Sequence, residues 1–211
     1  MRMRFAPEGW LFVVPVVILA AVSLLLQQTI FVIVFGLVAA FLINFFRDPH
    51  RAGSDRHVDV LSPADGTVVQ IKPIDDSAVW PGLTTQVSIF MNVFDVHVNR
   101  APISGRIVHY KYLPGKKLAA MVEKSSTDNE QNLIVVEDAR GHKIAFKQIA
   151  GLLARRIVFD KKEGDEVVRG ERIGMIKFGS RVDIFFPAHA EIRVRMRDKV
   201  KVGLTVIAEI P

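Results

Sequence analysis

The sequence predicts a mainly β protein, in which an antiparallel β domain follows an N-terminal transmembrane helical hairpin. Three observations support this class. A long apolar segment without a charged residue runs from Gly9 to Phe46. After it, short runs of β-branched and apolar residues alternate with turns that carry Gly, Pro, Asp and Asn. A short pattern also recurs near the C-terminus. We expect a membrane-anchoring hairpin over residues 1–50 and a β-rich domain over residues 51–211.

The apolar segment is too long for one membrane span. As a single helix it would be about 57 Å long at about 1.5 Å per residue, against a hydrocarbon core of about 30 Å. Two helices, Trp10–Leu26 and Thr29–Phe46, fit better, with Gln27 and Gln28 as the polar turn between them. A cleaved signal peptide would have a much shorter apolar region. A re-entrant hairpin that enters only one leaflet remains an alternative to a spanning one.

The charges beside this segment predict its orientation. Basic residues lie on both flanks: Arg2, Arg4, Arg47, Arg51 and Arg56. The positive-inside rule therefore places both ends of the hairpin, and the β domain, on the cytoplasmic side of the cell membrane.

Composition narrows the partners. The chain of 211 residues has no cysteine, which excludes disulfides and thiolate metal sites, and its six histidines show no metal-ligand spacing. We therefore expect no metal. The net charge of +6 indicates an anionic partner. Beside an apolar N-terminus, and without a nucleic-acid-binding motif, that partner is expected to be anionic lipid.

The expected strands follow the short apolar runs, and the segment Asp138–Gly141 between two of them is typical of a hairpin turn. One soluble helix is expected at about Lys116–Lys124. The runs are Thr67–Ile71, Gln86–Phe90, Arg106–Tyr112, Leu133–Glu137, Ile144–Ile149, Arg155–Phe159, Ile173–Lys177, Val182–Phe186, Glu191–Met196 and Thr205–Ile210.

A weak repeat links two turns near the C-terminus. Residues Asp165–Ile173 match Asp198–Val206, with Asp, Val, Gly and an apolar residue in register. The pattern resembles the turns of lipoyl- and biotinyl-type barrel-sandwich hybrid domains, and we expect a domain of that kind. The alternative is that Asp-x-Val-x-x-Gly is simply a common β-turn signal.

The dipeptide Gly179-Ser180 joins two expected strands, so it falls at a tight turn. Glycine allows close backbone approach, and the following serine can turn its hydroxyl onto the preceding carbonyl. The resulting ester can eliminate to dehydroalanine, which hydrolyses to a pyruvoyl group. A bare Gly-Ser is also a common hairpin turn, so it gains meaning only from its context.

Two other segments carry candidate acid–base groups. Asp65 precedes Gly66 and could simply form a turn. Asp95, His97 and Asn99 alternate, so on a strand they would share a face, where the carboxylate could orient the imidazole. A single histidine in a strand is more often a structural polar residue.

Taken in order, the motifs resemble the phosphatidylserine decarboxylase family in its short, cysteine-free form. They cover most of the chain: Phe46-Arg47-Asp48-Pro49, Ser62-Pro63-Ala64-Asp65-Gly66, Asp95-Val96-His97, Asn129-Glu130-Gln131-Asn132 and Phe178-Gly179-Ser180. The resemblance implies a self-processing lyase that decarboxylates phosphatidylserine in the membrane to phosphatidylethanolamine.

The resemblance also implies roles for single residues. Ser180 becomes the covalent pyruvoyl cofactor, and cleavage after Gly179 gives chains 1–179 and 180–211, which stay together as a heterodimer. Asp65 and His97 would activate the serine, with Asp95 supporting. Longer members have a second histidine where this chain has Arg100. The resemblance therefore leaves open how serine activation and later proton transfer are divided among Asp65, Asp95 and His97; in one arrangement His97 serves both.

The lipid phosphate would be held by basic residues, for which Arg47, Arg51 and Arg100 are the candidates. The sequence leaves open the lipid backbone, phosphatidylserine or archaetidylserine, and whether a higher oligomer forms.

Two other functions compete. A membrane-anchored barrel-sandwich adaptor without enzymatic activity would normally carry heptad-rich helical arms, and the sequence has none. A membrane serine hydrolase could use Ser180 with Lys177 as its base, although residues three apart on a strand point to opposite faces.

Overall fold

The computed structural model describes residues 3–75, 78–115, 129–151, 157–177 and 180–211. The expected helix at Lys116–Lys124 and the cleavage-site residue Gly179 lie outside these ranges. The chain divides into two compact units, Met1–His50 and Arg51–Pro211.

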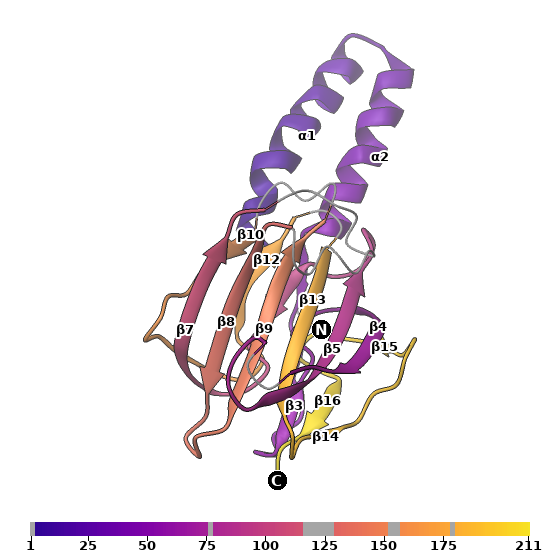
Figure 1. Cartoon of the computed structure of the whole chain (residues 1–211). Coiled ribbons are helices and arrows are strands. Elements are labelled where there is room, and N and C mark those ends of the chain that lie inside the picture. The colour runs from indigo at the N-terminus through magenta and orange to yellow at the C-terminus, as the bar shows by residue number, and fades with distance from the viewer. Residues whose placement is uncertain (1–2, 76–77, 116–128, 152–156, 178–179) are drawn as a thin grey trace. The chain divides into compact units, whose positions relative to one another are not determined.

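The first unit is a helical hairpin closed by a short β ribbon (Figure 1). Helix α1 runs over Trp10–Leu25 and α2 over Thr29–Phe45, so each ends one residue earlier than expected. Between them Gln27 has a left-handed backbone with φ of 55°. The outward side chains of both helices are almost entirely apolar. Such a surface fits association with a membrane.

The two ends of the hairpin are tied together. Strand β1 (Met3–Phe5) pairs antiparallel with β2 (Arg47–Pro49), and a short 3₁₀ helix, η1 (Pro7–Gly9), leads into α1. The N–H of Ala6 donates to the carbonyl of Phe46 at 2.8 Å. The chain therefore enters and leaves the hairpin at the same end.

Segment Pro7–Leu25 is long and apolar enough to cross a membrane, whereas Thr29–Phe45 is a shorter apolar helix. Together they bear out the expected apolar hairpin in its chain positions. A span and a re-entrant loop both fit these lengths.

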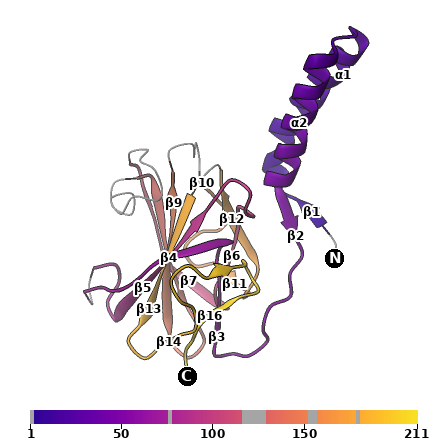
Figure 2. The same ribbon diagram turned by 90° about the vertical axis from the view of Figure 1, so that its right-hand side faces the viewer.

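The second unit is built on a curled antiparallel sheet that forms a half-barrel (Figures 1 and 2). Its strand order is β11-β7-β8-β9-β13-β5-β4-β15. These strands are β4 (Gly66–Pro73), β5 (Leu83–Met91), β7 (Gly105–Leu113), β8 (Gln131–Glu137), β9 (Lys143–Ala150), β11 (Glu166–Val167), β13 (Ser180–Pro187) and β15 (Lys199–Val200).

Two smaller antiparallel sheets accompany it, with orders β10-β12-β6 and β14-β16-β3. Their strands are β3 (Asp59–Leu61), β6 (Val98–Arg100), β10 (Ile157–Phe159), β12 (Arg172–Ile176), β14 (Glu191–Ile192) and β16 (Val206–Glu209). The mainly β class is confirmed, and every expected run overlaps a strand. The run at Glu191–Met196 is too long by four residues, because β14 ends at Ile192, before the turn at Arg197, whose φ is 73°.

Strand β13 shows how the sheet separates two faces. Alternate side chains point to opposite sides of a strand. Val182, Ile184 and Phe186 belong to the main core, whereas Phe185 packs in a smaller cluster on the outer face with Leu83. Ser180 shares the core face by the same alternation.

The sequence repeat is a structural repeat. In each copy the aspartate side chain accepts the backbone N–H three residues earlier: Asp165 from Lys162 at 3.0 Å and Asp198 from Arg195 at 2.8 Å. A glycine with positive φ ends each turn, 78° at Gly170 and 67° at Gly203.

Each copy also pairs with the first residues of a long strand. β11 pairs with β7 at Gly105, and β15 pairs with β4 at Gly66. A Cβ at Gly105 would collide with the carbonyl oxygen of Glu137, and one at Gly66 with that of Phe90. The sheet is therefore made of two similar halves, β11-β7-β8-β9 and β13-β5-β4-β15, that run in opposite directions.

Candidate active site

Ser180 is the first residue of β13 and is fully buried. It lies between two neighbours in register, Met91 at the end of β5 and Ala150 at the end of β9. Its Oγ donates to the thioether sulfur of Met91 at 3.2 Å. Thioether sulfur is a weak acceptor, so little free energy opposes turning the hydroxyl toward another group.

His97 precedes β6 and lies beside the strand that leads to Ser180. The backbone N–H of Ile176, at the end of β12, donates to the His97 carbonyl at 3.3 Å. The imidazole is fully buried, and its Nδ1 lies 3.0 Å from the backbone oxygen of Asp95. A carbonyl can only accept a hydrogen bond, so Nδ1 carries the proton in the neutral ring and Nε2 carries the lone pair.

Asp95 contributes to the position of His97 through its backbone. Neither residue lies on β6, because the chain turns over residues 93–95 before that strand begins. The Asp95 carboxylate accepts the N–H of Asn92 at 2.9 Å and so holds this turn. The Asp95 carbonyl contacts the imidazole.

Asp65 precedes β4, at the same end of the strands as Ser180. Thr67 pairs with Phe90 of β5, so Gly66 is level with Met91, the register partner of Ser180, and Asp65 lies one residue beyond that level. Two strand spacings separate Asp65 from β13, roughly 10 Å. The carboxylate is buried, accepts the Val202 N–H at 2.6 Å and forms a two-pronged ion pair with Arg51.

A buried chain of amides connects three of the sequence motifs on the core face. Asn99 donates to the Pro63 carbonyl at 3.2 Å and accepts from Gln148 at 2.9 Å. Gln148 in turn accepts from Asn132 at 3.2 Å and pairs in register with Val182. The chain passes beside the strand that begins at Ser180.

Another amide side chain, that of Asn129, binds the end of β9 next to Ser180. Asn129 donates to the carbonyl of Ala150 at 2.7 Å, and Ala150 is the register partner of Ser180. Asn129 and Asn132 belong to a motif for which the sequence predicted no role. Gln148 belongs to no motif. In the sequence it is a single amide beside Lys147 in the mostly apolar run Ile144–Ile149.

The three candidate arginines differ in their surroundings. Arg51 binds Asp65 and also donates to the Val202 carbonyl at 3.1 Å, and its side chain is only 8% exposed. Arg100 donates to the carbonyl of Gly170 at 2.8 Å. Arg47 belongs to the hairpin unit, where it donates to the Asn44 carbonyl. The guanidinium groups of Arg51 and Arg100 thus both bind protein acceptors, and their binding of a lipid phosphate stays a prediction.

Known proteins share this sequence over most of its length. The model of the family described as "Phosphatidylserine decarboxylase" matches residues 38–208. The chain belongs to the phosphatidylserine decarboxylase family. It is therefore a member of an enzyme family, and the resemblance inferred from the motifs is confirmed.

Individual relatives agree. A protein of Magnetococcus marinus is 44% identical over 97% of this chain and 94% of its own length. One of Solibacter usitatus is 47% identical over 98% and 97%, and one of Amoebophilus asiaticus is 48% identical over 82% and 77%. All three are described as phosphatidylserine decarboxylase proenzymes.

Proposed function

We propose that this chain cleaves itself between Gly179 and Ser180 and then decarboxylates phosphatidylserine with the pyruvoyl group that remains at position 180. The observation that carries the proposal is the position of Ser180. Its buried hydroxyl lies at the start of β13, at the end of the strands where Asp65 also lies. The segment that carries His97 lies beside the strand that precedes Ser180 in the chain.

The cleavage begins with the Ser180 hydroxyl, which is a poor nucleophile until a base removes its proton. His97 Nε2 takes that proton, because the Asp95 carbonyl fixes the other nitrogen as the donor. Attack on the Gly179 carbonyl moves the acyl group from nitrogen to oxygen and leaves an ester. Loss of a proton from Cα and of the Gly179 carboxylate from Cβ cleaves the chain. Water then converts the dehydroalanine to pyruvoyl and releases ammonia.

The surroundings of Ser180 suit the group that would be formed there. The position is closed to solvent and lies on the face with the buried amide chain, and its present hydrogen-bond partner is the weakly bound Met91 sulfur. When present, the pyruvoyl group supplies an electron sink for the decarboxylation. The chain's own residues place the lipid headgroup, exclude water and return a proton from His97 to the substrate carbon.

The substrate is expected to come from the membrane in which the hairpin unit anchors the enzyme. Its apolar outer surface anchors the enzyme in the bilayer that contains the lipid. We propose that both ends face the cytoplasm, since they emerge together and carry the basic residues. Tags at Met1 and Pro211 should both be protected, or both be digested, in oriented vesicles. Opposite protection would contradict a hairpin.

The mass of the purified full-length protein tests the cleavage. Wild type should give one chain ending at Gly179 and one running from position 180 to Pro211, whose first residue lacks an amine. Ser180→Ala should give a single intact, folded, inactive chain, because alanine fits the strand but has no attacking oxygen. An intact wild type that still releases CO₂ from phosphatidylserine would exclude the mechanism.

The histidine role has its own test. His97→Gln should leave much of the protein uncleaved, since an amide cannot take the serine proton. Normal cleavage with lost decarboxylation would restrict His97 to the later proton transfer. Normal cleavage and normal activity would remove it from both steps.

Family membership favours this function over its two rivals. An adaptor without enzymatic activity and a serine hydrolase that uses Lys177 as base both predict an uncleaved chain. The same mass measurement therefore separates all three.

A further inference from the structure

The face of β13 opposite Ser180 carries a buried ion pair. Arg181 Nε lies 2.6 Å from Asp183 Oδ1, and the two side chains are 3% and 1% exposed. Side chains at 181 and 183 point away from the core face on which Ser180 lies. The pair therefore takes no direct part in chemistry at position 180.

This pair is fastened to neighbouring strands by side-chain hydrogen bonds. Arg181 Nη2 donates to Ser88 Oγ at 2.8 Å on β5 and to Gln70 Oε1 at 3.0 Å on β4. Gln86, also on β5, donates to Asp183 Oδ2 at 3.1 Å and to Ser88 at 2.9 Å. These bonds connect β13 with β5 and β4.

A second cation lies beside Asp183. Lys147 of β9 is its register partner. Burial lowers the pKa of the Lys147 ammonium, and the charge of Asp183 acts in the opposite direction. Asp183 thus faces positive charge on its own strand and on β9.

Buried ion pairs are weak devices for stability, because desolvation offsets most of the attraction. Their best-supported use is to fix register. A shift of β13 by one residue would bring the charges of Arg181 and Asp183 into the apolar core. The pair therefore specifies one register for the strand.

The need for such a device would arise on cleavage. Before it, β13 is covalently attached at both ends. After it, Arg181 is the second residue of a new chain, and only the strand ladder and side chains hold that end. Chain ends are the places where structure opens most easily.

We propose that Arg181 and Asp183 anchor the new chain end, through Gln70, Gln86 and Ser88, and so keep position 180 in the active site after cleavage. This rests on the proposed self-cleavage. The anchor joins the two products, since Arg181 and Asp183 belong to chain 180–211 and their three partners to chain 1–179. Both are positioning residues.

Amide hydrogen exchange of residues 181–184 in the detergent-solubilised full-length protein tests the anchor. Arg181→Met should speed exchange by about tenfold in the cleaved protein. In an uncleaved Ser180→Ala background the same substitution should change it much less, because the peptide bond still holds the strand. Equal effects in both backgrounds would show an ordinary structural ion pair and overturn the proposal.

Kinetics give a second readout. Cleaved Arg181→Met should lose kcat with little change in KM, because the anchor places position 180 and not the lipid. Asp183→Asn keeps the shape of the site and serves if Arg181→Met does not fold. Arg106→Met is the control, since it removes an exposed ion pair with Glu166 at the edge of the sheet. It should leave exchange of residues 181–184 and kcat unchanged.

A failure of the proposed function would be visible separately. If the wild-type mass shows one chain, no new end exists and the anchor proposal fails with the cleavage. If wild type is cleaved and the exchange is insensitive to Arg181→Met, only the anchor proposal fails.

Discussion

The two ends of the curled sheet are built alike, yet only one carries the candidate active site. At one end the Asp65 carboxylate accepts the N–H of Val202 at 2.6 Å. At the other end the Ser104 hydroxyl accepts the N–H of Arg169 at 2.9 Å. Val202 and Arg169 each follow the aspartate of the repeat by four residues. The side chains of Asp65 and Ser104 therefore occupy equivalent positions, and each accepts a backbone N–H from one turn of the repeat.

The difference between them separates folding from function. A serine hydroxyl is enough to hold this turn, as Ser104 shows. Asp65 adds a buried charge, which costs desolvation and needs Arg51 as its partner. The fold alone gives no reason for that cost. We infer that the Asp65 carboxylate is present for the chemistry at Ser180.

The largest effect is expected from Asp65→Asn. Asparagine still offers an oxygen to Val202 and fits the same space, so the domain should fold. It lacks the negative charge, so cleavage at Gly179-Ser180 should fall by orders of magnitude. Intact mass over time measures this, and thermal unfolding checks the fold. Wild-type cleavage rates would show that Asp65, like Ser104, only holds a turn.

The matched control is Ser104→Ala at the other end. It removes the equivalent hydrogen bond and should cost about 1 kcal/mol of unfolding free energy. Cleavage and decarboxylation should stay at wild-type levels. Loss of cleavage here would mean that the two ends are coupled and that the comparison does not isolate the chemistry.

Arg51→Met distinguishes two roles for this arginine. Breaking a buried ion pair typically costs about 3–5 kcal/mol of unfolding free energy. Without Arg51 as its partner, the Asp65 carboxylate should also support self-cleavage at Ser180 more slowly. We therefore expect lower stability and slower cleavage. A phosphate-binding role would instead leave cleavage intact and raise KM for phosphatidylserine in mixed micelles. That second pattern would restore the sequence-based expectation.

A smaller effect is expected from the buried amide chain. Gln148→Leu removes the link between Asn99 and Asn132 and leaves their polar atoms without it, which typically costs about 1–3 kcal/mol. The cleavage rate should fall severalfold, because Asn99 also fixes the Pro63 carbonyl two residues before Asp65. Gln131→Leu, on the neighbouring strand, is the control for a buried amide outside this chain. Equal effects of both variants on cleavage would show that only burial matters.

The sequence was sufficient for the helices and the longer strands of this fold, because local patterns specify them. The uncharged segment after Glu8 predicted both helices to within one residue, and β-branched runs marked the strands. The repeat at Asp165 and Asp198 predicted two equivalent turns. Short strands such as β3 and β6 were missed, since a strand of three residues has too few alternations to show a period.

The site was harder to predict, because its contacts join residues far apart in the chain. Family motifs predicted roles for Ser180, His97 and Asp65, and these roles stay predictions. They did not show that Arg51 would pair with Asp65, or that the Asp95 carbonyl would orient the imidazole. Both features depend on the register of strands and on a turn, which no local pattern specifies.

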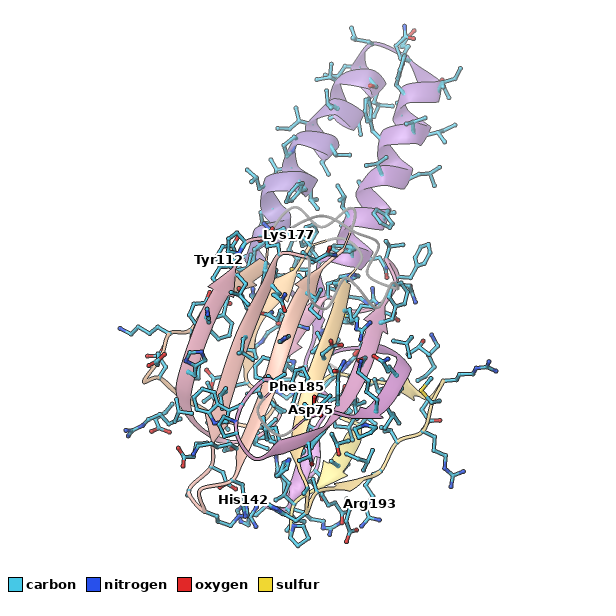
Figure 3. The ribbon with its side chains drawn as sticks, in the orientation of Figure 1. Asp75, Tyr112, His142, Lys177, Phe185 and Arg193 are labelled. Atoms are coloured by element: carbon cyan, nitrogen blue, oxygen red, sulfur yellow. The ribbon has the colours of Figure 1, made fainter. Side chains whose placement is uncertain are left out.

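The smallest effect is expected at the end of the sheet remote from Ser180. His142 lies at this end, and Lys177 lies at the other end (Figure 3). Asp138 holds the β8–β9 turn there. Burial would raise the pKa of its carboxyl, but hydrogen bonds from His142 and Arg140 outweigh it and the pKa is lowered. A lowered pKa in the folded state adds stability above the unfolded-state pKa, near 4, and that stability is lost as the pH falls through the folded-state value.

Asp138→Asn should therefore lower the unfolding free energy at pH 7 and flatten its decline below about pH 4. Urea unfolding of the full-length protein at both pH values measures this. The exposed carboxylate Asp75 offers the control, and Asp75→Asn should leave both values near wild type. Self-cleavage of Asp138→Asn should proceed normally, since this turn and Ser180 lie at opposite ends of β9 and its neighbour β13. Impaired cleavage in this variant would show that even the remote end of the sheet affects the reaction at Ser180. It would then be wrong to assign function to one end of the sheet and only folding to the other.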